Sequence, residues 1–223
     1  MCIRDRRIDA IGLTLERYDT QLREEEMQKL AAEAELKALR AQINPHFLFN
    51  ALTTIGYLIE SAPPRAVHTL MRLTHLLRGV LRPDGEFTTL GRELELVEHY
   101  LDIERERFEE RLRVRLDVPQ ALRAVPIPSL VVQPLVENAI KHGVAPSTRG
   151  GDVAVVARRE SGPNGPRLRV TVSNTGAPLS ATYRRGGEHV GLDNVERRLA
   201  GHYRGAASIT LTADAQLLSL IHI

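Results

Sequence analysis

The sequence predicts an α+β protein whose helical first half precedes a half that mixes helices and strands. In the first half, apolar residues recur at intervals of three and four, the periodicity of helices that bury one face. From Arg113 the period changes to two, because residues 113–118 alternate polar and apolar side chains like a half-buried strand. Helices and strands then follow each other, which predicts a sheet with helices on one face.

The N-terminal segment is expected to form one long helix. Apolar side chains step by three and four over residues 8–22, and the same register returns over residues 32–43. A helix of about 35 residues with few stop signals favours a parallel coiled coil between two chains. A single amphipathic helix on its own domain is the alternative.

The remaining elements follow from the same patterns. The helical pattern continues past residue 46 to residue 59 and stops at the Pro63-Pro64 turn. A second helix at 65–81 should fold back antiparallel, and a highly charged third helix is expected at 90–108. After the strand at 113–118 we expect a helix at 129–142, strands at 152–158 and 168–173, a glycine-containing loop, a helix at 192–202 and a strand at 208–212.

The composition excludes several classes of protein. A 43% hydrophobic and 26% charged chain with a net charge of +2 is typical of soluble globular proteins, and direct binding of nucleic acid is not expected. The single cysteine rules out an intramolecular disulfide and fits a cytoplasmic location. No run approaches the ~18 apolar residues that span a bilayer, so any membrane or sensory region would precede this chain in a longer parent.

Pro45 and His46 form the most unusual pair in the helical half. A proline inside a helix costs about 3 kcal/mol, because it removes a hydrogen bond and clashes with the preceding turn. We therefore expect Pro45 to bend the helix and present His46, which we interpret as the reactive residue. A surface histidine beside a kink is the alternative. Asn50, one turn further on, could orient the imidazole.

Two segments of the second half predict a nucleotide pocket. Asn138, Lys141 and His142 lie on neighbouring positions of a predicted helix, where they would offer an amide oxygen for Mg²⁺ and donors for phosphate oxygens. A charged helix end capped by Gly143 is the alternative.

Asn174 and Gly176 end a predicted strand, and a glycine-containing loop then runs into the helix at 192–202. Glycines let backbone amides approach phosphates, and the start of a helix adds a positive dipole end. P-loop and Rossmann motifs are missing from the sequence, so those two ways of binding a nucleotide are not expected.

These segments together resemble a known family. The matching blocks are LRAQINPHFLFN at 39–50, YLDIE at 100–104 with Arg107 and Phe108, QPLVENAIKHG at 133–143, and VGL at 190–192 followed by Asn194 and RRL at 197–199. In this order they resemble the kinase core of sensor histidine kinases of the LytS/YehU type, over about residues 30–213.

The resemblance implies a role for each block. His46 would be the phosphoacceptor on a helical dimerisation hairpin, followed by an α/β-sandwich ATP-binding domain of the GHKL (Bergerat) type. Asn138 would bind Mg²⁺ and Lys141 and His142 would lie near the phosphates of ATP. Asn174 and Gly176 would lie at the adenine, and Gly187, Gly191 and Leu192 would belong to the glycine-rich lid loop.

The implied organisation is a coiled-coil linker at 1–29, a dimerisation and phosphotransfer region at 30–110, an ATP-binding domain at 111–214 and a non-native tail at 215–223. The implied reaction is autophosphorylation of His46 from Mg-ATP in a homodimer, followed by transfer to an aspartate of a response regulator receiver domain. A membrane would be reached only through a sensor region N-terminal to this chain. A degenerate, non-catalytic dimeric scaffold is the alternative, and an ATP hydrolase without a phosphohistidine is disfavoured by Pro45-His46.

The sequence departs from the family pattern at several positions, among them His189, where the lid loop often has glycine. Asn174 replaces an aspartate that accepts from the adenine amino group in many relatives, and a neutral acceptor makes a weaker bond. Phe47 stands where many kinases have a carboxylate next to the reactive histidine. The tail at 215–223 does not match the family's last strand, so we expect this strand to be missing from the sheet.

Overall fold

The computed structural model describes residues 44–81, 85–162, 165–176, 190–203, 207–210 and 219–222. The predicted coiled-coil helix over residues 8–43 therefore lies outside the described residues. Within the described ranges, no helix combines the length and the apolar character needed to cross a membrane.

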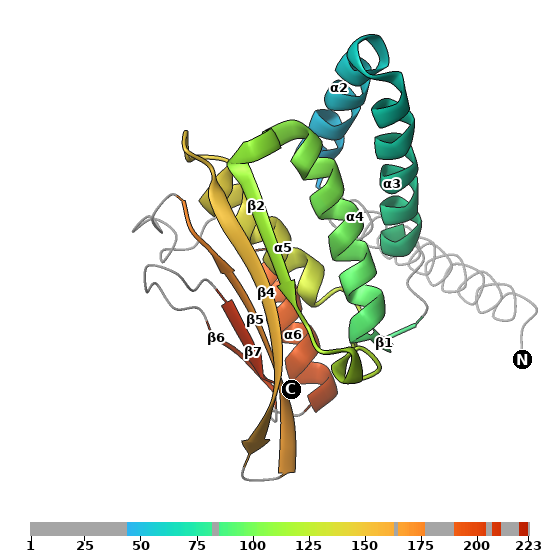
Figure 1. Cartoon of the computed structure of the whole chain (residues 1–223). Coiled ribbons are helices and arrows are strands. Elements are labelled where there is room, and N and C mark those ends of the chain that lie inside the picture. The colour runs from blue at the N-terminus through green and yellow to red at the C-terminus, as the bar shows by residue number, and fades with distance from the viewer. Residues whose placement is uncertain are drawn as a thin grey trace, which may run out of the picture. The chain divides into compact units, whose positions relative to one another are not determined.

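A helical hairpin opens the described part of the chain. It consists of α2 (Pro45–Ser61) and α3 (Pro63–Leu81), which are separated by Ala62 and run antiparallel (Figure 1). The buried side chains of α2 recur with helical spacing, at Phe47, Ala51, Ile55 and Leu58. The predicted hairpin is thus present.

The role predicted for Pro45 needs correction. Pro45 is the first residue of α2, and Asn44 before it is not helical. At the start of a helix, proline costs no hydrogen bond, because its missing N–H would have no partner inside the helix. Its ring also disfavours helical backbone at the preceding residue. Pro45 therefore starts a helix next to His46 and does not bend a continuous one.

The third helix, α4 (Leu90–Phe108), ends and begins as predicted. Thr89 caps it by accepting a hydrogen bond from the Arg92 backbone N–H at 3.2 Å. The short strand β1 (Phe87–Thr89) precedes it and pairs antiparallel with β3 (Pro126–Pro128). α4 contacts both α3 and α5 (Val132–Ala139), so it lies between the hairpin and α5.

The second layer is a mixed five-stranded sheet. Its order is β2 (Leu112–Asp117), β4 (Gly151–Gly162), β5 (Gly165–Asn174), β7 (Ser219–His222) and β6 (Ser208–Thr210), with β2 and β4 parallel and the other pairs antiparallel. α4, α5 and α6 (Val190–Tyr203) lie on one face of this sheet (Figure 1). The predicted α+β class, a helical hairpin followed by an α/β sandwich, is confirmed.

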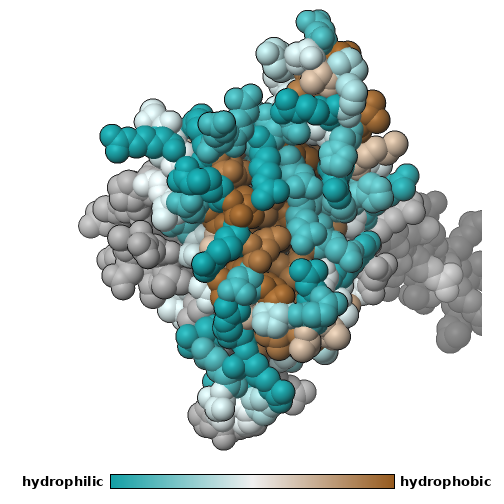
Figure 2. Space-filling model, viewed as in Figure 1, coloured by the Kyte–Doolittle hydropathy of each residue, from teal (hydrophilic) through white to brown (hydrophobic). Residues whose placement is uncertain are grey.

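The two faces of the sheet differ in character. Val153, Val155 and Ala157 of β4 are fully buried under the helices, and the residues between them are more exposed. On the open face, ion pairs join neighbouring strands: Arg113 with Asp152, Arg158 with Asp117, and Arg169 with Glu160 across the β4–β5 pair. Figure 2 shows apolar residues along the middle of this side, over β2 and β4, between hydrophilic margins.

Two further predictions are corrected by the structure. The helix predicted at 129–142 begins at Val132 and changes at Ile140 into a π-helix, Ile140–Val144. The tail was expected to leave the sheet without its last strand, but residues 219–222 form β7 between β5 and β6. Backbone pairing requires an extended segment and no particular family motif. This short run of the tail therefore pairs with β5 although it does not match the family's last strand.

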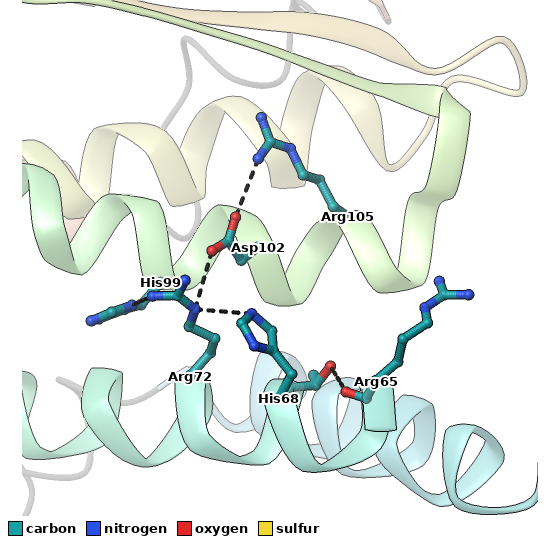
Figure 3. A network of polar contacts seen from close by, with 7 residues as sticks. Arg65, His68, Arg72, His99, Asp102 and Arg105 are labelled. Atoms are coloured by element: carbon teal, nitrogen blue, oxygen red, sulfur yellow. Dashed lines mark hydrogen bonds and ion pairs between the residues drawn. The ribbon is translucent and has the colours of Figure 1, made fainter. Parts of the chain in front are cut away.

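Polar contacts around Arg72 of α3 connect this helix to α4 (Figure 3). Arg72 donates from Nε to His68 Nε2 at 3.2 Å and lies 2.9 Å, through Nη1, from His99 Nδ1. Asp102 on α4 pairs with both Arg72 and Arg105. Because a guanidinium only donates hydrogen bonds, this arrangement requires both ring nitrogens that face Arg72 to carry no proton.

The close contact between α3 and α4 predicts the effect of a single methyl group. A Cβ atom at Gly79 would overlap the side chain of Leu96 on α4. We expect Gly79→Ala to lower the free energy of unfolding by about 1 to 3 kcal/mol in a denaturant titration, because overpacking forces the helices apart. Gly201→Ala is the control, since a Cβ there meets nothing within 4 Å, and it should not destabilise. Equal stabilities of the two variants would contradict the close approach.

His99 should give this contact a pH dependence. Burial, Arg72 and His75 lower the pKa of His99, against the opposing charges of Asp102 and Glu95. The unfolded chain then binds the proton more readily, so stability falls as the pH drops below about 6.5.

We expect the free energy of unfolding of the wild type, relative to that of His99→Asn, to decrease from about pH 7.5 to about pH 5.5, because the Asn Oδ1 accepts from Arg72 without titrating. Denaturant titrations of both chains at both pH values measure this difference. The same pH dependence in wild type and variant would show that His99 is not the titrating group.

Candidate functional site

His46 is exposed in the first turn of α2. The Asn50 amide nitrogen, one turn further on, lies 3.3 Å from both Nδ1 and Nε2 of the imidazole. An atom equidistant from both ring nitrogens cannot lie along either lone pair, so the amide lies over the ring. The predicted contact between Asn50 and His46 is therefore present, but it supports the ring and does not select one tautomer.

Phe47 anchors the turn that carries His46. Its ring is buried and lies 4.9 Å, centroid to centroid, from the ring of Tyr100 on α4. Tyr100 is itself buried, which raises its pKa well above the usual value, and its hydroxyl donates a hydrogen bond to Glu104. Phe47, which stands where many kinases have a carboxylate beside the histidine, thus holds α2 against α4.

The segment with Asn138, Lys141 and His142 spans a change of helix type. Asn138 lies in the last turn of α5 and is partly exposed, and the π-helix that follows carries Lys141 and His142. The Ala145 N–H donates to the Ile140 carbonyl at 2.9 Å, the five-residue spacing of a π-turn. Short π segments inside helices occur frequently at functional sites. Lys141 is exposed and His142 is partly exposed.

The structure brings this segment together with the end of β5. A Cβ at Gly143 would overlap the side-chain amide of Asn174, and a Cβ at Gly176 would overlap the Gly143 carbonyl. Gly176 also has a φ of 125°, which favours glycine. Residues 138–143 and 174–176, which the sequence predicted as parts of one pocket, therefore lie in contact.

Asn174 has an unsatisfied hydrogen-bond acceptor at the place where these two segments meet. Its side chain is 7% exposed, and its Oδ1 is buried without a hydrogen-bond partner among the described residues. Its Nδ2 points to the Thr175 carbonyl at 3.4 Å. A buried acceptor without a partner is costly, so this site fits a ligand that brings an N–H donor, such as the amino group of adenine.

The donor set also fits a magnesium nucleotide. Among the described residues no group of three or more His, Cys, Asp or Glu side chains could hold a metal ion. Mg²⁺ commonly binds through one or two protein oxygens together with the phosphates of its substrate. Asn138 would supply the protein oxygen, as the sequence predicted.

The remaining predicted residues lie at α6. Gly191 and Leu192 are in its first turn, and Leu192 is buried in the core. Gly187 lies outside the described residues. The roles predicted for these residues at a lid loop stay predictions.

The sequence did not predict that the carboxylate directly before Asn138 is largely desolvated. Glu137 keeps some contact with solvent, but desolvation raises its pKa to about 7, with a further contribution from Glu104 on α4. Gln133 donates to Glu137 at 2.8 Å and opposes the shift. In the sequence, Glu137 could have been noticed as an acidic residue near the buried apolar residues Val136 and Ala139 of α5.

An exposed histidine at a helix start, followed by an α/β sandwich in which the two predicted pocket segments meet at a buried amide oxygen, is the arrangement expected of a histidine kinase. Residues 34–112 match the family model described as Histidine kinase. Residues 34–112 thus carry the sequence pattern of that family, and the predicted resemblance to sensor histidine kinases of the LytS/YehU type is confirmed.

Particular relatives are similar over most of the chain. The Escherichia coli K12 sensor histidine kinase BtsS is 37% identical over 191 residues, covering 85% of this chain and 33% of BtsS. YesM of Bacillus subtilis 168 is 35% identical, covering 81% and 31%, and the Staphylococcus aureus Mu50 sensor histidine kinase/phosphatase LytS is 32% identical, covering 83% and 33%. The chain thus spans about a third of the length of these relatives.

Solved structures of histidine kinases are also similar. The histidine kinase domain of the Erythrobacter litoralis EL346 blue-light activated histidine kinase aligns with a TM-score of 0.47 at 18% identity, covering 84% of this chain and 92% of that one. The catalytic domain of the histidine kinase ThkA aligns with a TM-score of 0.43 at 14% identity, covering 61% and 94%.

The contact between Gly143 and Asn174 can be tested directly. We expect Gly143→Ala to lower the free energy of unfolding by about 1 to 3 kcal/mol, because the new methyl group overlaps the Asn174 amide. The loss should be smaller in an Asn174→Ala background, where the methyl group has room. Denaturant titrations of the four chains measure this, with Gly56→Ala, where a Cβ meets nothing within 4 Å, as control. Additive effects of the two substitutions would contradict the contact.

Proposed function

We propose that this chain is the kinase core of a two-component sensor, which phosphorylates His46 from Mg-ATP and passes the phosphoryl group to an aspartate of a receiver domain. The observation that carries the proposal is the contact of residues 138–143 with Asn174, whose buried amide oxygen has no partner. The exposed His46 supplies the nucleophile. The relatives named sensor histidine kinases support it.

The proposed reaction has two steps. A lone pair on a ring nitrogen of His46 attacks the γ-phosphorus of ATP, a P–N bond forms, and the bond from that phosphorus to the β–γ bridging oxygen breaks, releasing ADP. An aspartate carboxylate of the receiver domain then attacks the same phosphorus, and the P–N bond breaks. A neutral imidazole has the required lone pair, and Phe47 leaves no carboxylate next to it in the chain.

The pocket residues would bind and orient the nucleotide. Asn174 would accept a hydrogen bond from the adenine amino group, and Asn138 would hold Mg²⁺. Lys141 and His142 would donate to phosphate oxygens, and a bound Mg²⁺ would offset the charge that develops there. Gly176, Gly187, Gly191 and Leu192 would shape the base site and the lid.

The hairpin has an apolar surface suited to a homodimer. On α2, Phe49, Leu52 and Ile59 are 69%, 49% and 60% exposed and recur at helical spacing on one side. On α3, Val67, Leu70 and Met71 are 59%, 48% and 57% exposed. A second copy of the hairpin would bury both stripes in a bundle of helices. The expected location is cytoplasmic, with a membrane reached through a sensor region N-terminal to this chain.

A non-catalytic dimeric scaffold is the second candidate. The amide of Asn174 in place of a charged acceptor favours it, because a neutral acceptor binds adenine more weakly. Melting curves with and without Mg-ATP separate the two functions, since a ligand that binds only the folded chain raises the melting temperature. A melting temperature independent of Mg-ATP would favour the scaffold.

The site assignment is tested by labelling with γ-phosphate. We expect the wild type to gain acid-labile, base-stable label that His46→Gln lacks, because the amide of glutamine forms no stable bond to phosphorus. His75→Gln, another exposed histidine of the hairpin, should label like the wild type. Labelling of His46→Gln at the wild-type level would overturn the assignment.

A further inference from the structure

We propose that Glu93 of α4 is a positioning residue that fixes the start of α5 and thereby the place of Asn138. The inference rests on the proposed function, because Asn138 acquires its role there. Glu93 touches neither the pocket residues nor His46 among the contacts described above. It acts on the backbone that carries Asn138.

Glu93 is a carboxylate enclosed in the core. Its side chain is 1% exposed, and it accepts hydrogen bonds from three successive backbone N–H groups. These come from Leu130 at 2.6 Å, from Val131 at 3.0 Å and from Val132 at 3.0 Å. The first N–H groups of a helix have no partner inside it, so Glu93 satisfies the start of α5 from another helix.

The turn before α5 is shaped for an anion. Leu130 has a φ of 57°, and Val131 follows in helical conformation with φ −106° and ψ −43°. This alternation of left-handed and right-handed backbone makes successive N–H groups converge, as in backbone nests that bind anions. Val131 at the N-cap position has no side-chain acceptor of its own. Burial raises the pKa of the Glu93 carboxyl, and the hydrogen bonds from the backbone N–H groups oppose this shift because they favour the ionised form. The ionised carboxylate would lie favourably at the positive end of the helix.

The same turn is held from α6. Arg198 donates through Nη1 to the Ser129 carbonyl, and Ser129 is further bound to residues before β1, through its N–H to Glu86 and its hydroxyl to Gly85. Residues 129–132 thus connect α4 and α6 at the start of α5. Asn138 lies six positions after Val132, within two turns of continuous helix, so a displaced start moves Asn138 with it.

Removing the charge should therefore weaken nucleotide binding. In Glu93→Gln a single amide oxygen replaces two carboxylate oxygens, and the new NH₂ group faces backbone donors. We expect the Kd of Mg-ADP to rise about tenfold, measured by titration of the full chain at a temperature where circular dichroism shows it folded. Arg198→Met, which loses the bond to Ser129, should raise the Kd in the same direction and by less.

Leu96→Ala is the matched control. Leu96 is equally on α4 and 5% exposed, but its side chain lies against Gly79 of α3. It should lower the melting temperature while leaving the Kd of Mg-ADP within about twofold of wild type. A Kd of Glu93→Gln within twofold of wild type, or a rise equal to that of Leu96→Ala, would overturn the inference. Arg198→Met carries the same test if Glu93→Gln does not fold.

Amide hydrogen exchange separates this inference from the proposed function. If the wild type binds no nucleotide, the proposed function fails, and Glu93 is judged by the amides of residues 130–132 alone. Faster exchange of these amides in Glu93→Gln than in Leu96→Ala supports the positioning role. Equal exchange in the two variants overturns it.

Discussion

The packing of α4 between the hairpin and α5 is the constraint on which the rest of the described structure depends. Leu90, Leu94 and Val97 of this helix are completely buried, and Leu101 is 1% exposed. Burial of each such side chain stabilises the fold by about 1.5 to 3 kcal/mol. One helix thereby supports both halves of the proposed chemistry: through Tyr100 it holds the turn of His46, and through Glu93 it holds the start of the helix that carries Asn138.

The elements that the sequence predicted well are those with a clear hydrophobic period and local stop signals. α4 matches residues 90–108 because apolar positions recur along a charged helix and Thr89 provides a cap. Pro45 was misread because the cost of proline depends on its position in the helix, and position 1 costs nothing. The π-helix at Ile140 and the pairing of β7 depend on contacts with distant strands, which local periodicity does not contain.

The candidate site, too, was predicted from the sequence only in part. Asn138, Lys141, His142, Asn174 and Gly176 were predicted from residue types and family blocks, and contact between the two segments appears only in the folded chain. Glu93 could not be predicted, since its partners are backbone N–H groups 37 to 39 positions away and backbone groups leave no residue-type signal. Glu137 lies within one of the family blocks, but its raised pKa could not be predicted, because this shift depends on burial in the folded chain.

The orientation of the Asn174 amide bears on which purine the pocket would select. Its nitrogen faces the Thr175 carbonyl, and its buried oxygen has no hydrogen-bond partner among the described residues, so a bound base would meet the oxygen. Adenine offers an amino donor at position 6, whereas guanine offers a carbonyl there, so an amide held this way attracts the first base and repels the second. A freely rotating amide would present either atom and lose this discrimination. In the proposed pocket, the neighbouring main-chain carbonyl would thus give the neutral Asn174 side chain the preference for adenine that a carboxylate has by its charge.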